Sequence, residues 1–298
     1  MKTIFALCLL AALPVYSQSE EAIEIDPLTA PAAKLGYTFQ SNKDLDWNQG
    51  SLVTPLTPKF QLTESLSAGA LFNYRVTSFK DLGSSERNGI FNRDGLGNPD
   101  VEDTYHSFGV PIYLHYDPRD SKWGVFGQLA PRLSSDLNQV DSNDIYYTGF
   151  TAITYDVSRC LTVNFGIGNS LALGDDDFKF FAGFSYTPFE ELNISLSGST
   201  LTASYSVNDR LIVRGGGYAG GGLWNQDLNG ESFDLTLSSY NVGVGADYRL
   251  TENIWLSVWG GATIANRIGI QSSSGSLLDE EDMDTGAFGY IGLKAFEW

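Results

Sequence analysis

One short turn pattern recurs six times along the chain and limits what it can fold into. Each copy has an aromatic residue, a turn of polar residues or proline, and an apolar residue that opens a new run. The copies are FQLTESL (60–66), YDPRDSKW (116–123), YDVSRCL (155–161), YTPFEEL (186–192), YSVNDRL (205–211) and YRLTENI (248–254). Such turns between alternating runs predict β-hairpins.

The residues that flank these turns alternate between apolar and polar with a period of two. Before the turn at 186–192, one face holds Phe178, Phe180, Ala182, Phe184 and Tyr186, and the other holds Lys179, Gly183 and Ser185. A strand with one wholly apolar face is suited to a sheet that meets lipid. Because lipid offers no hydrogen bonds to the backbone, such a sheet must close on itself.

Long polar segments stand at the opposite ends of the expected hairpins, at 80–103, 134–144, 220–234 and 268–285. Short turns at one end and long acidic loops at the other are the asymmetry of an outer-membrane barrel, with periplasmic turns and extracellular loops. The tyrosines that open five of the six turns fit a membrane interface. We therefore expect an all-β fold, a single up-and-down antiparallel transmembrane β-barrel. A soluble, secreted β-protein is the alternative.

The strand number follows from the turns. Six turns join twelve strands, and runs at 35–40 and 288–298 add one at each end. Two places oppose a count of fourteen: residues 193–204 are short for two membrane strands, and Pro55 and Pro58 fall inside the expected second strand. We expect 12 to 14 strands: either the hairpin at 193–204 is short or the count is twelve, and the second strand begins late or carries a bulge.

The final strand, FGYIGLKAFEW (288–298), places Phe288, Tyr290, Phe296 and Trp298 on one face. It resembles the C-terminal strand of bacterial outer-membrane barrels, which implies that Phe296 and Trp298 form a signal for the barrel-assembly machinery. Lys294 departs from that pattern, since an apolar residue is usual there. Over 34–298 the turns also resemble outer-membrane β-barrel domain families of unknown function, in which Tyr-x-Pro-Asn-Asp-like turns recur. That resemblance implies no activity.

The first seventeen residues, MKTIFALCLLAALPVYS, have a cation before an apolar run and small residues after it, which predicts a cleaved signal peptide. The alternative is a buried N-terminal helix. We expect a signal peptide at 1–17, a periplasmic tail at 18–33 and the barrel at 34–298, in the cell outer membrane. Cys160 alone would remain in the mature chain, so no intramolecular disulfide could form.

Charge narrows the range of partners. The chain has 36 acidic and 18 basic residues, a net charge of −18, whereas nucleic-acid binding needs a cationic surface. The expected partners are outer-membrane lipid and lipopolysaccharide, with divalent ions bridging the acidic segments to its phosphates as one possible role. The segments NRDGLGNPDVED (92–103) and LLDEEDMD (277–284) lack the offsets of an EF-hand, so solvated charge is the default interpretation.

Residues suited to catalysis are scarce. The chain has two histidines, His106 near a loop end and His115 at a turn. The segment around Ser170 lacks the following helix of a nucleophile elbow, and the glycines at 215–220 lack the helix of a dinucleotide site. We expect no catalytic, cofactor or metal site.

The leading functional hypothesis is a passive channel or porin-like protein for small solutes. Its expected lumen-facing residues are Arg75, Gln128, Asn164, Lys179, Arg214, Asn241, Asp247 and Arg249. Their mixed sign argues against strong ion selectivity. The alternative is a structural or adhesive surface barrel with a closed lumen and functional acidic loops. An outer-membrane hydrolase that uses His106 is the third hypothesis.

Overall fold

The computed structural model describes residues 33–80, 104–118, 120–138, 140–174, 177–228, 231–272 and 275–296. The expected signal peptide, Trp298 and residues 81–103 of the first long segment lie outside this part of the chain. The described residues are mainly strand, with two 3-10 helices, η1 (Ser142–Asp144) and η2 (Leu171–Leu173). Neither helix is long and apolar enough to cross a membrane.

Sixteen strand segments make up one sheet. They are β1 (Ala33–Ser41), β2 (Asp46–Gln61), β3 (Leu66–Lys80), β4 (Thr104–Gly109), β5 (Ile112–Tyr116), β6 (Trp123–Ser135), β7 (Ile145–Ser158), β8 (Leu161–Asn169), β9 (Lys179–Phe189), β10 (Leu192–Ser197), β11 (Thr200–Asn208), β12 (Leu211–Leu228), β13 (Glu231–Arg249), β14 (Ile254–Ser272), β15 (Leu277–Met283) and β16 (Gly286–Ala295).

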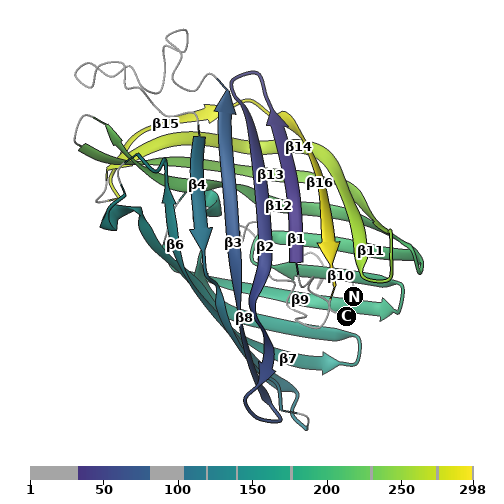
Figure 1. Ribbon diagram of the computed structural model, residues 1–298. Coiled ribbons are helices and arrows are strands. Elements are labelled where there is room, and N and C mark those ends of the chain that lie inside the picture. Colours follow the sequence, from purple (N-terminus) through teal and green to yellow (C-terminus); the bar gives the residue numbers. More distant parts are fainter. Residues whose placement is uncertain are drawn as a thin grey trace, which may run out of the picture.

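The sheet closes into a barrel because β1 pairs with β2 on one side and with β16 on the other (Figure 1). Segments β4 and β5 both lie between β3 and β6, and β15 and β16 both pair with β14. Each of these two pairs fills one strand position, which makes a closed, antiparallel, up-and-down barrel of 14 strands. The predicted fold class is confirmed, at the upper limit of the predicted strand number.

The outer face of the barrel is apolar and the inner face is polar. In β1, Leu35, Tyr37 and Phe39 are exposed, while Thr38 and Gln40, which alternate with them, are buried. In β9, Phe180 is 82% exposed, an extreme value for a phenylalanine in water. A continuous apolar outer face is what hydrocarbon requires of a transmembrane barrel.

The two places that opposed a count of fourteen are resolved by local irregularities. Segments β10 and β11 form a short hairpin whose turn includes Gly198, with φ of 56°. Strand β2 runs through Pro55 with register shifts on both sides of Thr57. The Thr57 hydroxyl accepts a hydrogen bond from the Ala70 amide, which replaces a backbone acceptor beside the bulge. Both expected features, a short hairpin and a bulge, are present.

Two segments that we expected to be loops are strands instead. Residues 220–228 and 231–234 belong to the β12–β13 hairpin, and most of 268–285 belongs to β14 and β15. The sequence GGGLWNQDL gave no alternation because, as shown below, neither face of this part of β12 meets lipid. The prediction of long loops there was wrong.

Candidate functional site in the barrel interior

Six short turns mark one end of the barrel, which we call the turn end. Toward the opposite end, neighbouring strands have irregular backbone positions at one level, and we call each of these positions a break although β12 and β14 continue through it. In β12 the break is at Gly221, with φ of 140°, and in β14 it is at Ala265, with φ of 51°. The β13–β14 register shifts between Ser238 and Tyr240, and residues 284–285 separate β15 from β16. We call the part beyond this level the cover: residues 221–228, 231–238, 266–272 and β15.

The inner part of the cover is buried on both of its faces. All residues from Ala219 to Gln226 are buried, and so are residues 233–237. A strand in the barrel wall would bury only every second residue. Here the hairpin leaves the wall and fills the mouth of the barrel.

The β12 hairpin reaches the opposite wall. Asn225 pairs with Ser135 of β6 in a single parallel bridge. The Ser134 hydroxyl donates to the Leu223 carbonyl at 2.6 Å, and the Tyr105 hydroxyl donates to Oε1 of Gln226 at 2.5 Å. In the described residues, hydrogen bonds therefore span the barrel from β12 to β4 and β6.

An aromatic cluster packs beneath these bonds. The Trp224 side chain is 1% exposed, and its ring centroid lies 5.8 Å from that of Phe79 and 5.5 Å from that of Tyr105. The same buried cluster includes Leu45, Trp47, Leu235, Leu237 and Ile268. Leu45 before β2 and residues from β2, β3, β4, β12, β13 and β14 thus form an apolar core inside an otherwise polar barrel.

A small polar cavity lies directly below the cover, lined in part by Gln40, Arg75, Tyr218, Gly221 and Asn241. Nη1 of Arg75 donates to the Gly221 carbonyl at 3.3 Å, at the level where the strands break. Nε2 of Gln40 and Oδ1 of Asn241 are buried without a hydrogen-bond partner among the described atoms. Arg75 therefore links the wall at β3 to the break in β12.

Nearer the turn end, the interior carries small polar side chains that are only half buried. On β9, β10 and β11 these are Ser185, Thr187, Asn193, Ser195, Thr202, Ser204 and Ser206. Nδ2 of Asn193 donates to the Ser185 and Thr187 hydroxyls at 3.0 Å each. Leu201, Tyr205 and Val207 point the other way and are exposed on the outer face.

A charged group lies beside these hydroxyls. Nη2 of Arg214 is 2.6 Å from Oδ2 of Asp247, and Nζ of Lys294 is 3.1 Å from the same oxygen. The side chains of Arg214 and Lys294 are 15% and 11% exposed. One buried carboxylate on β13 therefore holds two cations, one from the adjacent strand β12 and one from β16, which lies beyond β14.

The structure places the expected lumen-facing residues in three groups. Buried in the interior are Arg75, Asn164, Asn241 and Asp247, and half buried are Gln128, Lys179 and Arg214. Arg249 lies at a short turn, where its guanidinium donates to the Thr251 and Glu252 carbonyls. Arg214 and Asp247 are in contact, but Arg75 and Asn241 line the separate cavity under the cover.

Sequence reasoning missed Lys294, which we had taken as a departure from an apolar pattern. In β16, Phe288 and Tyr290 are buried in the interior, and Ile291 and Leu293 are exposed outside. Lys294 shares the inner face with Phe288 and Tyr290. The useful signal was the outer pair, Ile291 and Leu293, because their alternation shows which face meets lipid.

The residues considered for catalysis have structural partners. The Tyr74 hydroxyl and Nδ1 of His106 are 3.0 Å apart, while the neighbouring Ser107 hydroxyl lies 2.8 Å from that of Ser134. His106 lies within β4, not at a loop end, and Ser107 points to the opposite face of that strand. The Ser170 hydroxyl accepts from the Ala172 amide and caps η2.

The acidic segment 277–284 lies mainly in β15, where Arg267 of β14 pairs with Glu280 at 3.8 Å and Asp282 at 2.8 Å. Among the described residues, no group of three or more His, Cys, Asp and Glu side chains is placed to hold a metal ion. Residues 92–103 lie outside the described part.

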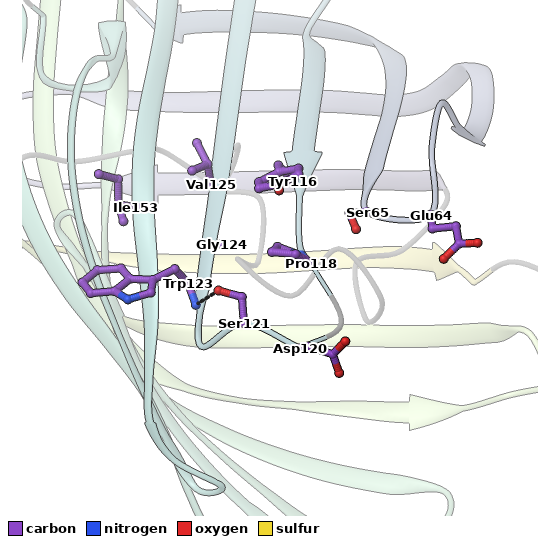
Figure 2. A pocket seen from close by; sticks show the side chains of 10 residues that line it. All are labelled: Glu64, Ser65, Tyr116, Pro118, Asp120, Ser121, Trp123, Gly124, Val125 and Ile153. Atoms are coloured by element: carbon purple, nitrogen blue, oxygen red, sulfur yellow. Dashed lines mark hydrogen bonds between the residues drawn. The ribbon is translucent and has the colours of Figure 1, made fainter.

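A groove on the outer face lies near the turn end, between the turns that follow β2 and β5 (Figure 2). Its wall has exposed Tyr116, Trp123 and Ile153, with Glu64 and Asp120 on its rim. Aromatic rings beside polar groups suit a lipid–water interface. Since these apolar side chains face outward, the groove is separate from the interior.

No protein-family model and no curated protein sequence matches the chain. Solved structures with a similar fold include a FadL homologue from Pseudomonas aeruginosa, with 10% identity over 89% of this chain and 90% of that one, at a TM-score of 0.42. The NanC porin has 9% identity over 90% and 100% of the chains, at 0.38. Outer membrane phospholipase A from Escherichia coli has 12% identity over 96% and 100%, at 0.35.

These likenesses are distant, so the function proposed below rests on this chain's own residues. Membership of the domain family suggested by the turn pattern stays a prediction.

Proposed function

We propose that this chain is an outer-membrane β-barrel channel for small solutes, closed by its cover in the conformation described above. The apolar outer face and the closed sheet support a membrane location. The half-buried hydroxyls and charged groups near the turn end support a water-accessible interior. Residues 1–17 are then a signal peptide, the turn end faces the periplasm, and the cover faces the cell exterior.

The observation that carries this proposal is the way the cover is attached. Strands β12 and β13 pair continuously from Leu211–Tyr248 to Leu228–Glu231, so their hairpin is able to move without breaking its own ladder. Its links to β4 and β6 are side-chain hydrogen bonds, the packing of Trp224 against Tyr105, and the single Asn225–Ser135 bridge.

A disulfide across the mouth tests the channel directly. Ser135 and Asn225 are paired across the bridge, so cysteines at both positions, with Cys160→Ser, are placed to lock the cover. In planar bilayers we expect the reduced protein to show opening events and the oxidised protein to lose them. The matched control carries Asn225→Cys and Cys160→Ser alone. Absence of conductance in the reduced protein and in a variant without residues 222–237 would refute the proposal.

The membrane location has its own test. A closed barrel resists dodecyl sulfate until heated, because its ladder has no free edge. We expect the unheated protein in the outer-membrane fraction to migrate faster than the heated protein. Recovery only in the soluble periplasmic fraction would contradict the location.

A second candidate is a surface barrel whose closed mouth presents β15 to a partner. Among the described strands, β15 pairs only with β14, and its Glu280, Glu281 and Asp282 are exposed. Replacing these three residues by alanine would then abolish surface attachment and leave conductance unchanged. We further propose that the chain is not an enzyme, which a hydrolase activity lost in His106→Ala would contradict.

A further inference from the structure

Four charged side chains form a band around the inner wall toward the turn end. They are Lys34 on β1, Arg214 on β12, Asp247 on β13 and Lys294 on β16, and we call them the basic belt. Their registers place them at nearby levels: Arg214 lies opposite Gly245, Asp247 opposite Ser257, and Lys294 opposite Lys34. With β14 between β13 and β16, the belt crosses five neighbouring strand positions of the closed sheet.

The belt has more positive than negative charge. Asp247 is its one carboxylate and contacts both Arg214 and Lys294. The charged groups that act on Lys294 are Arg214, Asp247 and Lys34. Three cations and one anion leave an excess of two positive charges.

Two of the three cations lie where their mutual repulsion destabilises the folded barrel. Lys34 and Lys294 are directly opposite each other on adjacent antiparallel strands, an arrangement that is unfavourable for like charges. Nζ of Lys34 lies 5.3 Å from the centroid of the Tyr290 ring, which gives it a cation–π contact. A barrel wall has no structural need for this pair, so a role in binding explains it better.

Other described interior charges do not offset the belt. Asp234 accepts from the Tyr146 hydroxyl at 2.7 Å, and Asp144 accepts from the Asp141 amide at 2.6 Å, both beside the cover. Buried Arg75 and Arg132 add two cations nearer the cover. Asp156, exposed near the turn end, accepts from the Thr162 hydroxyl at 2.6 Å and lies on β7, with β8 to β11 between it and the belt at β12.

We propose that the basic belt is a binding site for a small organic dianion, such as a dicarboxylate, and that it makes the channel select anions. This inference rests on the proposed channel function. Two excess positive charges match the charge of a dianion, and the half-buried hydroxyls of Ser204 and Thr202, on the strand next to Arg214, supply neutral donors for its oxygens. Partial burial strengthens the attraction because water screens it less. This differs from the weak selectivity expected from sequence.

Equilibrium binding tests the belt without any need for conduction. Succinate and 1,4-diaminobutane have the same number of carbons and opposite charge, and each is titrated calorimetrically into the full chain in nonionic detergent at low salt. We expect saturable binding of succinate only. Lys34→Gln, which leaves the contacts of Asp247 intact, should weaken succinate binding by about fivefold or more. Arg267→Gln, a cation removed from the exposed face of the cover, should leave it unchanged.

The inference is overturned if succinate does not bind, if the diamine binds equally well, or if Lys34→Gln binds like the parent. Conductance measurements in planar bilayers distinguish a failure of the binding site from a failure of the channel proposal. A protein that binds succinate but never conducts refutes the channel and keeps the site. A channel whose reversal potential in a KCl gradient shows cation preference, unmoved by Lys34→Glu, refutes the belt and keeps the channel.

Discussion

Trp224 is the side chain whose removal should open the barrel. It is 1% exposed and packs against Phe79 and Tyr105 in the cluster that holds the cover to the wall. A buried tryptophan covers about 200 Å² of surface, and its truncation to alanine in a core costs about 3 to 5 kcal/mol. Since the lost contacts join the cover to the barrel, this cost falls on the closed state.

We expect Trp224→Ala to shift the closed-to-open equilibrium toward the open state by about 100-fold or more. This factor corresponds to the lower figure of about 3 kcal/mol. Single-channel recordings of the refolded protein measure it as a rise in open probability. The matched control is Trp123→Ala, which removes an indole that is 56% exposed on the outer face. An open probability that changes by less than about twofold, or equally in both variants, would refute the idea that this cluster closes the channel.

Three further predictions concern the break at Gly221, the basic belt and barrel assembly. Gly221→Val combines a φ of 140° with a contact between the added side chain and the Leu237 carbonyl, so the cover should become sensitive to limited proteolysis while the barrel stays resistant. Asp247→Asn removes the carboxylate shared by two cations and should destabilise the barrel by about 3 kcal/mol in urea unfolding; Asp247→Asn with Lys294→Gln should recover part of that loss. If the resemblance of the last strand holds, Phe296→Ala should reduce the amount of heat-modifiable barrel in the outer membrane, and unchanged assembly would argue against it.

The inner and outer faces of most strands could be predicted because alternation is local information. Phe178, Phe180 and Ala182 lie on the exposed face, as their spacing indicated, since successive side chains of any strand point to opposite sides. The repeated turns likewise specified antiparallel neighbours and an even strand number. Closure followed from one requirement, that a sheet in lipid leaves no edge unpaired.

The inner and outer faces of β16 were not predicted from the sequence. The sequence placed Phe288 and Tyr290 on one face without specifying what that face meets, and both fill the interior, where Tyr218 contacts Phe288 with their rings 5.9 Å apart. Aromatic side chains suit both an apolar interior cluster and the membrane interface. Which of the two a ring occupies depends on the strands across the barrel.

The sequence by itself determined that this chain is a closed sheet with an apolar exterior, because period and turn chemistry act between neighbours along the chain. The tertiary structure alone decided that the β12–β13 hairpin enters the mouth and that Lys294 meets Asp247, 47 positions away. Both outcomes depend on the register between strands and on contacts across the barrel. No local pattern specifies these contacts, because a glycine-rich polar segment has the same sequence pattern whether it projects into water or packs inside the barrel.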